Sequence, residues 1–561
     1  MAFIVSTIAL ENSEKVEDVY IIGKYQRINS HILFIKGSFY PENHFELNDL
    51  LQEIIKNGIE IIGEIKGYFC GIYYNIEKKE LYFFTDKFGH FDLFFYFKDN
   101  LLIISDFFNE ILLSKNFSLS DVEVESIYEF ILFEFPLFEK TFIKFIKFVS
   151  MGTIYKFDLN SNSLIKNQYY DYKFNITMSF NINNIIFQLD RLFNNAFKRI
   201  KRMNPSDSVY GLGLSGGMDS RLVAYYAIKY KLKIKTFIYG ETNSDAYYIS
   251  RKLVKLLGLE HYELGFNRDF FNSSEKSINY NPMMNVLYTW YYAIFEKLPE
   301  FDILLSGYIG DYQFGMYLDK WDKFIKDNTE FVENILKCHI EIGNIDDIAC
   351  YFNKSSIISD IKKKIIHFSN ISKNSEFWQK KEEFNYKYRQ RIFWKNLPSF
   401  NFLGLYNQIS IFTDLDLFDF LMQIPFELRL KRSLFYSFLK AKLPELLKIR
   451  PERRIPVYYR NFLIKFFYRI IRYFDKKLKT HIIFKKSYKE IRGWLSGYEP
   501  FINYINNLFS KDNPLFYKLF NPIKIKKLIS KSKWNSIEIQ LIFRFMTIKL
   551  FLDKIIFNLK Y

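Results

Sequence analysis

Residues 209–227, VYGLGLSGGMDSRLVAYYA, contain the turn that decides the fold of the larger part of the chain. VYGLG is typical of a buried strand, and SRLVAYYA is typical of a helix. Between them, Ser215–Ser220 place two serines, two glycines and a carboxylate on one short turn. A strand, a glycine-rich turn and a helix in this order form an anion site, because small residues let backbone N–H groups approach a ligand and the helix start adds a positive dipole end. The alternative is an ordinary tight turn before a capped helix.

The polar side chains of this turn indicate a nucleotide bound together with a metal ion. The hydroxyls of Ser215 and Ser220 can donate hydrogen bonds to phosphate oxygens. Asp219 would repel a bare phosphate, so its presence predicts a bridging Mg²⁺. The turn is not a Walker loop, because no Gly-Lys-Ser or Gly-Lys-Thr follows it.

The first 115 residues are predicted to form a sheet-based α+β domain. HILFIKGSFY, GYFCGIYYN, ELYFFTDKFG, FDLFFYF and NLLIISDFF are short β-branched or aromatic runs. Lys98-Asp99-Asn100 predicts a hairpin turn, and FELNDLLQEIIKNG predicts a helix that stops at a glycine. Residues 120–175 alternate short helix and strand signals, which we interpret as a connector.

From about residue 180 the pattern predicts a parallel sheet with packed helices. INNIIFQLDRLFNNAFKRIKR is an amphipathic helix, KIKTFIYG a strand, and SDAYYISRKLVKLLG a helix that ends at Gly258. Strand and helix alternate at βαβ spacing, and after about 320 the chain is mostly helical. We therefore expect two domains, over residues 1–175 and 180–561.

Composition excludes several classes of protein. The 561 residues carry a net charge of +17 and three cysteines, so a disulfide framework and a clustered zinc site are not expected. No signal peptide or membrane-spanning run is evident, so a cytoplasmic protein is expected. The net charge would suit nucleic acid, but the family resemblance described below weighs against it, so nucleic acid is not an expected partner. The basic, aromatic stretch at about 460–486 is interpreted as a packed helix with a solvated face; contact with a membrane surface is the alternative.

Several stretches in order resemble the asparagine synthetase family. SGGMDS is similar to the SGGxDS loop of enzymes that cleave ATP to AMP and pyrophosphate. GYFCGIYYNIEKKELYFFTDKFG, FPLFEKTFIKFIKFVSMGTIYKFDL, LLSGYIGDYQFGMY, FTDLDLFDFLMQIP and KRSLFYSFLKAKLPELLKIRP resemble later segments of that family. The resemblance implies an N-terminal Ntn-hydrolase-like (class II glutaminase-like) α+β sheet domain. An α/β parallel-sheet ATP-pyrophosphatase domain with a helical C-terminal part would follow it.

The resemblance also implies cofactors and site residues. ATP and Mg²⁺ are the expected cofactors, with Asp219 and Asp311 as the metal ligands. The expected ATP-binding residues are Leu214, Ser215, Gly216, Gly217, Asp219, Ser220, Ile238, Gly240 and Gly307.

The chain departs from the family at the glutaminase site. Glutamine-using members begin, after Met1, with a nucleophilic cysteine, whereas this chain has Ala2. Its first cysteine, Cys70, is interpreted as a buried strand residue. The family's glutamine-holding segment is replaced by Lys36–Tyr40. Glutaminase activity is therefore expected to be absent.

A second departure is Tyr308, three residues before Asp311, where asparagine synthetases usually carry glutamate. β-Lactam and carbapenam synthetases carry tyrosine in this part of the site, and lasso-peptide macrolactam cyclases form a related branch. Tyr308 is thus a candidate proton relay for an attacking amine, with a packing aromatic as the alternative. Its expected glutamate partner is one of Glu330, Glu333 and Glu341, among which the sequence does not choose.

Basic residues complete the candidate catalytic set. The family's pyrophosphate-facing lysine aligns with Arg432, and arginine can grip phosphate oxygens with two donors. Arg453 or its neighbour Arg454 is a candidate replacement for the lysine that stabilises the acyl intermediate; a solvent-facing charge run is the alternative.

Together these features predict an ATP-dependent, AMP- and pyrophosphate-forming amide ligase without glutaminase activity. Its partners would be a carboxylate and an amine, in the tailoring of a peptide, a natural product or a glycan. Asparagine synthesis from free ammonia and a catalytically silent homologue that binds ATP or a partner are the alternatives. A homodimer or a biosynthetic partner protein is possible.

Overall fold

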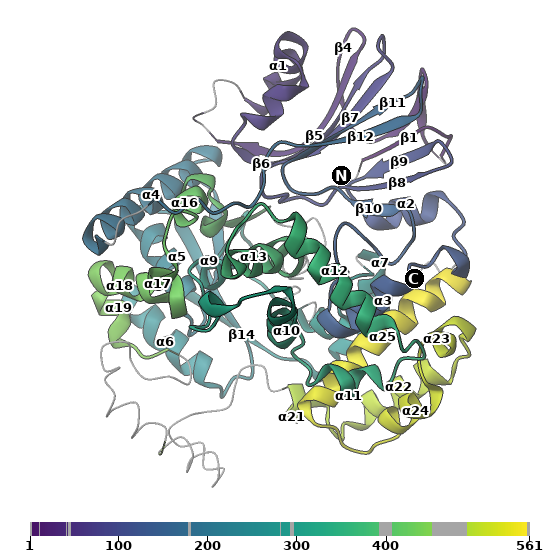
Figure 1. The fold of residues 1–561 in the computed structure, drawn as a ribbon. Helices are drawn as coiled ribbons and strands as arrows, with labels where there is room; N and C mark the ends of the chain where they lie inside the picture. The colour runs from purple at the N-terminus through teal and green to yellow at the C-terminus, as the bar shows by residue number, and fades with distance from the viewer. Residues whose placement is uncertain are drawn as a thin grey trace.

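The computed structural model describes residues 3–557, with gaps at 11, 41, 43–45, 178–180, 281, 292–296, 392–406, 452–469 and 471–490. Two antiparallel sheets from the N-terminal part lie above a larger parallel-sheet and helical part (Figure 1). The expected N-terminal sheet domain followed by a parallel-sheet α/β domain is confirmed at this level.

The two N-terminal sheets have six strands each. In order across the first sheet these are β10 (Ile146–Phe148), β8 (Phe94–Lys98), β9 (Leu101–Ser105), β1 (Ile4–Ser6), β3 (Val19–Ile22) and β2 (Glu14–Val16). Across the second they are β12 (Ser163–Gln168), β11 (Thr153–Asp158), β7 (Glu80–Thr85), β6 (Gly67–Asn75), β5 (His31–Phe39) and β4 (Gln26–Ile28).

The two sheets share one apolar core and carry helices on their outer faces. Side chains of β1, β3, β8 and β9 meet those of β5, β6, β7 and β11 in one buried cluster. The helix α1 (Leu50–Asn57) packs on the outside of the second sheet, and α2 (Phe108–Ser114) and α3 (Val124–Phe133) pack outside the first.

Local predictions for this part hold in detail. Asp99 and Asn100 both have positive φ, which suits the tight hairpin turn between β8 and β9. The helix α1 ends at Gly58, which has φ 84°. Residues 120–175, however, are more than a connector: β10 completes the first sheet, and β11 and β12 extend the second.

The third sheet is parallel and has five strands. Their order is β15 (Glu260–Gly265), β14 (Lys233–Gly240), β13 (Val209–Gly213), β16 (Ile303–Ser306) and β17 (Asn407–Ser410). The chain runs outward from β13 to β14 and β15 on one side and to β16 and β17 on the other. The strand order therefore reverses between β13 and β16.

Helices cover both faces of this sheet. Successive strand residues point to opposite faces, so neighbouring residues of one strand pack against different helices. Ile303 and Leu305 pack with α4 (Ile182–Met203), α5 (Met218–Lys229) and α18 (Ser433–Lys442). Leu304 packs in the cluster that contains α3 and α25 (Ser536–Phe557).

The remaining helices are α6 (Asp245–Leu257), α7 (Ser274–Tyr280), α9 (Gly310–Gln313), α10 (Asn328–His339), α11 (Ile345–Ala349), α12 (Ile357–Ile371) and α13 (Phe377–Phe384), which continues as a π-helix over Asn385–Gln390. They continue with α16 (Leu415–Leu421), α17 (Phe426–Arg429), α19 (Pro444–Lys448), α21 (Ile491–Leu495), α22 (Glu499–Ser510), α23 (Pro514–Leu519) and α24 (Pro522–Ile529). None of the helices in the described ranges is both long and apolar enough to cross a membrane.

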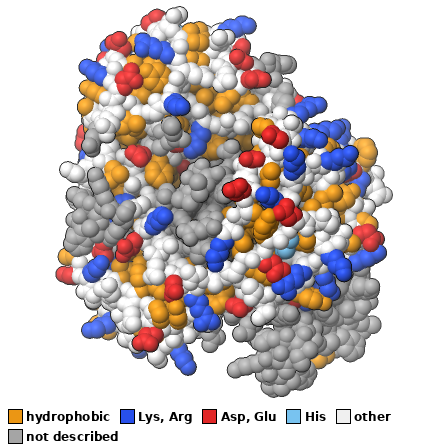
Figure 2. Space-filling view, turned by 180° about the vertical axis from the view of Figure 1, so that it is seen from behind, with side chains coloured by type: hydrophobic (Ala, Val, Ile, Leu, Met, Phe, Trp, Pro, Cys, Tyr) orange, Lys and Arg blue, Asp and Glu red, His pale blue; other side chains and the backbone are white. Residues whose placement is uncertain are grey.

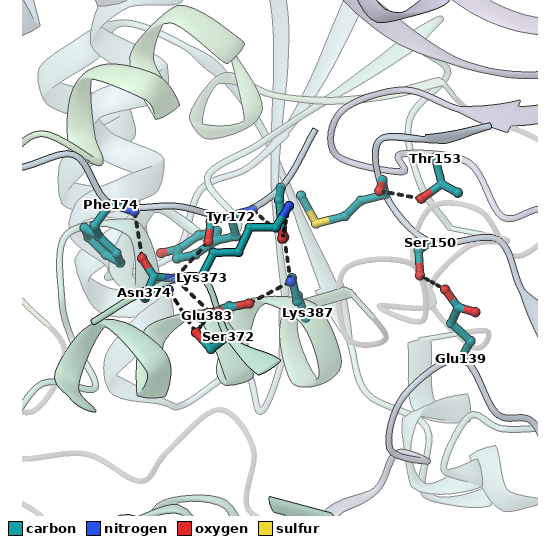
Figure 3. A network of polar contacts seen from close by, with 12 residues as sticks. Glu139, Ser150, Thr153, Tyr172, Phe174, Ser372, Lys373, Asn374, Glu383 and Lys387 are labelled. Carbon is teal, nitrogen blue, oxygen red and sulfur yellow. Dashed lines mark hydrogen bonds and ion pairs between the residues drawn. The ribbon is translucent and has the colours of Figure 1, made fainter. Parts of the chain in front are cut away.

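The N-terminal and C-terminal parts are joined by buried polar contacts. Arg544 of α25 donates to Glu134 Oε1 at 3.1 Å and to the carbonyls of Ile131 and Leu132, so the last helix is fixed to α3, beside which it lies in Figure 1. Figure 3 shows a second junction, in which Asn374 lies between Tyr172, Phe174 and Glu383. The Asn374 amide accepts from Phe174 N at 2.9 Å and donates to Tyr172 O at 2.9 Å.

Basic and acidic side chains are intermixed on the rear face of the molecule (Figure 2). The positive net charge is therefore not gathered on that face into one continuous patch of the kind that nucleic-acid binding uses.

Candidate functional site

The glycine-rich turn joins β13 to α5 at the edge where the third sheet reverses its strand order. Gly217 is the N-cap residue of α5. Because glycine has no side chain, it cannot accept hydrogen bonds from the first N–H groups of the helix. Ser215 Oγ accepts from Gly217 N at 3.2 Å and lies 3.5 Å from Ser220 Oγ. The two hydroxyls thus lie close together beside the start of α5, where the first backbone N–H groups of a helix can bind an anion.

The segment after β16 presses against the start of α5. A Cβ atom added to Gly307 would lie 3.0 Å from the carbonyl carbon of Asp219, and one added to Gly310 would lie 2.8 Å from Asp219 Oδ1. Between them, Ile309 has φ 58°, which turns the chain sharply into α9. Asp311, in the first turn of α9, is therefore held near Asp219, and its charge acts on the pKa of that group.

Arg432 lies directly on the Asp219 carboxylate. Its Nη2 pairs with Asp219 Oδ1, and its Nη1 lies 3.3 Å from Asp219 Oδ2. Burial raises the pKa of Asp219, the Arg432 charge opposes that rise, and the Asp311 charge adds to it. The structure therefore brings Asp219, Asp311 and Arg432 together. Arg432 pairs with Asp219, which the sequence analysis predicted to be a metal ligand. We call Ser215–Ser220, Gly307–Asp311 and Arg432 the Asp219 site.

The carboxylates of Asp219 and Asp311 suit a magnesium ion that is held jointly with a nucleotide. Mg²⁺ in phosphate-transfer sites is bound by one or two carboxylates together with phosphate oxygens. Asp219 and Asp311 supply two carboxylates. Within the described ranges there is no cluster of three or more acidic, histidine or cysteine side chains that could hold a metal. A metal at Asp219 and Asp311 would therefore need further ligand atoms, such as phosphate oxygens.

The predicted adenine side lies at the ends of β13 and β14. Gly240 ends β14 with φ 114°, and Ile238 is buried two residues earlier. Leu214 N donates to Phe237 O at 2.9 Å, and Leu214 O accepts from Ser250 Oγ at 2.8 Å. Both backbone groups of Leu214 therefore already have partners inside the protein, and its contact with adenine stays a prediction.

Tyr308 contacts Gln390, and its three candidate glutamate partners bond to other groups. Its hydroxyl donates to Gln390 Oε1 at 3.0 Å, on the π-helix. Glu330 and Glu333 have exposed side chains that bond to Lys326 N and Lys362, whereas Glu341 pairs with Arg389, next to Gln390. Burial raises the pKa of Tyr308 well above its usual value, so the phenol is neutral at ordinary pH.

Two arginines that the sequence analysis did not single out support the turn. Arg221 is 1% exposed and donates to the carbonyls of Leu446, Ile449, Arg450 and Gly216. Burial lowers the pKa of Arg221 to about 9. Arg450 pairs with the buried Asp245 at the start of α6, with 2.7 Å between Nη1 and Oδ2. No sequence pattern distinguishes these arginines from solvent-facing ones.

The other predicted basic residues, Arg453 and Arg454, lie outside the described residues, and so does nearly all of the basic stretch at 460–486. Their proposed roles stay predictions.

A second group of polar side chains lies in the N-terminal sheets, around Lys36 and Asp106, and there the carboxylate is bonded by protein donors. Asp106 Oδ1 accepts from Phe3 N at 2.9 Å, and Asp106 Oδ2 pairs with Lys36 Nζ at 2.8 Å. Cys70 is fully buried on β6, as the sequence predicted. Ala2 lies outside the described residues. We call Phe3, Lys36, Cys70 and Asp106 the Lys36 corner.

Comparisons with known proteins identify the region that carries the Asp219 turn. Residues 188–384 match the family model for asparagine synthase. The glutamine-hydrolyzing asparagine synthetases of Homo sapiens and Pongo abelii are each 37% identical to this chain over 97 residues, which are 16% of this chain and 17% of theirs. The matched segment thus spans about one sixth of the length of these curated relatives.

Two solved structures show weak overall similarity. The allosteric regulatory enzyme of purine biosynthesis is 8% identical, with a TM-score of 0.21, over 47% of this chain and 74% of that one. NMN synthetase from Francisella tularensis is 17% identical, with a TM-score of 0.18, over 39% of this chain and 95% of that one. At these scores neither likeness carries an argument. The match of residues 188–384 to the asparagine synthase model, with the 37% identity over 97 residues, supports membership of the asparagine synthetase family for the part of the chain that it covers.

Proposed function

We propose that this chain is an ATP-dependent amide ligase that transfers AMP to a carboxylate and then joins the acyl group to an amine. The observation that carries the proposal is the position of Asp219, Asp311 and the glycine-rich turn. All three follow the carboxyl ends of β13 and β16, where the strand order reverses. Ligands of open parallel sheets bind at this place, because two adjacent loops diverge there.

The reaction divides one difficult condensation into two steps. A carboxylate oxygen attacks the α-phosphorus of ATP, and the bond from that phosphorus to the β-phosphate oxygen breaks, so pyrophosphate leaves. The amine then attacks the acyl carbon, AMP leaves with the carboxylate oxygen, and the amine loses a proton. Activation is required because a carboxylate does not react with an amine in neutral water, whereas AMP is a good leaving group.

The residues of the Asp219 site would divide the work of the first step. The N–H groups at the start of α5 and the hydroxyls of Ser215 and Ser220 would hold phosphate oxygens. Asp219 and Asp311 would hold Mg²⁺, which neutralises charge on the leaving pyrophosphate when bound. Arg432 is close enough to contribute a further cation to the same phosphates.

The N-terminal domain is proposed to be glutaminase-like (Ntn-like) in descent but without glutaminase activity. The Lys36–Asp106 pair and the buried Cys70 support this proposal. The amine would therefore be supplied by the substrates themselves, which we propose to be a peptide, a natural product or a glycan precursor.

The test uses the full chain and two matched variants. We expect the wild type to bind α,β-methylene-ATP in the presence of Mg²⁺, measured by calorimetry. With a panel of carboxylates, it should exchange labelled pyrophosphate into ATP. Asp219→Asn should lower that exchange by at least about a thousandfold, because it removes a proposed ligand of the Mg²⁺ that would neutralise charge on the leaving pyrophosphate.

The control is Asp346→Asn, which alters an exposed carboxylate in the first turn of another helix, α11. We expect it to exchange pyrophosphate like the wild type. Failure of the wild type to bind the nucleotide analogue, or full exchange by Asp219→Asn, would contradict the proposed function.

A further inference from the structure

Arg432 contacts both carboxylate oxygens of Asp219, one of the two residues that would hold the proposed metal. Nη1 and Nη2 address both carboxylate oxygens, and the Arg432 guanidinium carbon lies 4.1 Å from the centre of the Phe435 ring. A planar guanidinium that meets a carboxylate with two nitrogens satisfies the acceptors that a cation would otherwise use.

The backbone that presents Arg432 is unusual. Lys431 has φ 53° and Arg432 has φ 62°, so two consecutive non-glycine residues are in the left-handed region. They lie between α17 and α18, where the chain kinks. Such conformations cluster at functional sites, where the surrounding structure holds them.

The guanidinium of Arg432 is also incompletely satisfied. The residue is 8% exposed, and its buried Nε has no hydrogen-bond partner. A buried donor without an acceptor is costly, and phosphate oxygens are well suited to a guanidinium. This donor therefore points to an anionic ligand beside Asp219, a second observation independent of the ion pair.

We propose that Arg432 and the divalent metal are alternative partners of Asp219, so that the site takes up the metal only together with a triphosphate. In the nucleotide-free protein, Arg432 neutralises Asp219, and its positive charge repels a free cation. A bound triphosphate supplies oxygens for both cations, so Arg432 moves to phosphate and Asp219 becomes a metal ligand. This inference rests on the proposed nucleotide site and adds an order of binding to it.

The probe is Mn²⁺, followed by electron paramagnetic resonance on the full chain. Without nucleotide, we expect the wild type to bind Mn²⁺ at least tenfold more weakly than Arg432→Met does, because only the variant frees the Asp219 carboxylate. The matched control is Lys431→Met, which removes the neighbouring positive charge from an exposed side chain with the same left-handed backbone. It should bind Mn²⁺ like the wild type.

Adding α,β-methylene-ATP separates the inference from the proposed function. We expect the analogue to raise the Mn²⁺ affinity of the wild type at least tenfold and that of Arg432→Met by a smaller factor. Equal nucleotide-free Mn²⁺ affinity in the wild type and Arg432→Met overturns the inference, even if the analogue still binds with Mn²⁺. Absence of analogue binding in every variant contradicts the proposed function instead.

Discussion

The Asp219 site and the Lys36 corner both contain a buried or half-buried ion pair, but they use their polar groups differently. In the Lys36 corner, each oxygen of Asp106 has a protein donor, from Phe3 N and Lys36 Nζ. In the Asp219 site, Arg432 Nε is buried without a partner, and the α5 start has no side-chain cap. The first arrangement is complete by itself, whereas the second has hydrogen-bonding capacity left for a ligand. Spare capacity, rather than charge alone, distinguishes a candidate site from a structural pair.

The largest effect that we expect in a test of this comparison is the loss of local stability in Arg221→Met. The substitution leaves the carbonyls of Leu446, Ile449 and Arg450 without their buried donor, which should lower the local opening free energy by about 3 kcal/mol. Hydrogen–deuterium exchange of residues 214–220 and 443–451 measures this change. Lys36→Met in the other region should lower the local opening free energy by only about 1 kcal/mol, since it removes one half-exposed donor and the buried Asp106 keeps the hydrogen bond from Phe3 N. Equal effects of the two substitutions would remove the distinction between the regions.

The next effect concerns the fit between Gly307 and α5. In Gly307→Ala, the new Cβ would lie 3.0 Å from backbone and side-chain atoms of Asp219, so the carboxylate must shift. We expect about tenfold weaker binding of α,β-methylene-ATP, about 1.4 kcal/mol, by calorimetry. Gly213→Ala is the control, because its Cβ would meet the Phe237 ring at an ordinary 3.6 Å. If both variants bind alike, the close packing at Gly307 does not position Asp219.

Much of the Asp219 site could be predicted because its signals are local. The turn, both flanking elements and the segment at Gly307–Asp311 are each continuous in sequence, and the structure places them as such elements. The strand β17 was missed because NQIS contains three polar residues and no apolar run, although it completes the third sheet beside β16. Its strand character comes from pairing with β16 and not from a pattern of its own.

Long-range contacts set the rest of the site and therefore could not be read from the sequence. Gln390 is 82 positions from Tyr308, and Arg432 is 213 positions from Asp219. The sequence favoured a glutamate partner for Tyr308, but the π-helix turns Gln390 toward it. The sequence placed Arg432 near pyrophosphate without indicating that it pairs with Asp219.

A smaller effect is expected for Tyr308→Phe. The Tyr308 hydroxyl donates to a neutral amide, which cannot accept its proton, and burial raises the Tyr308 pKa well above its usual value. The phenol therefore stays protonated between pH 6 and 9, so the pH profile of amide formation should not change. We expect turnover to fall by less than about fivefold, the scale of one neutral hydrogen bond. A fall of about a hundredfold with an altered pH profile would instead support the proton relay.

We expect no release of glutamate when glutamine is supplied to the wild type or to Cys70→Ala. A nucleophilic thiol must be reachable by its substrate, whereas Cys70 is 0% exposed on β6, and its Sγ faces the carbonyl of Asp92 at 3.9 Å. We expect no glutamate above background from either protein, measured by a coupled glutamate assay, while both retain nucleotide binding. Glutamate released by the wild type and lost in Cys70→Ala would identify Cys70 as a nucleophile. The Lys36 corner would then hold a working site, and the contrast between satisfied and unsatisfied polar groups would not separate the two regions.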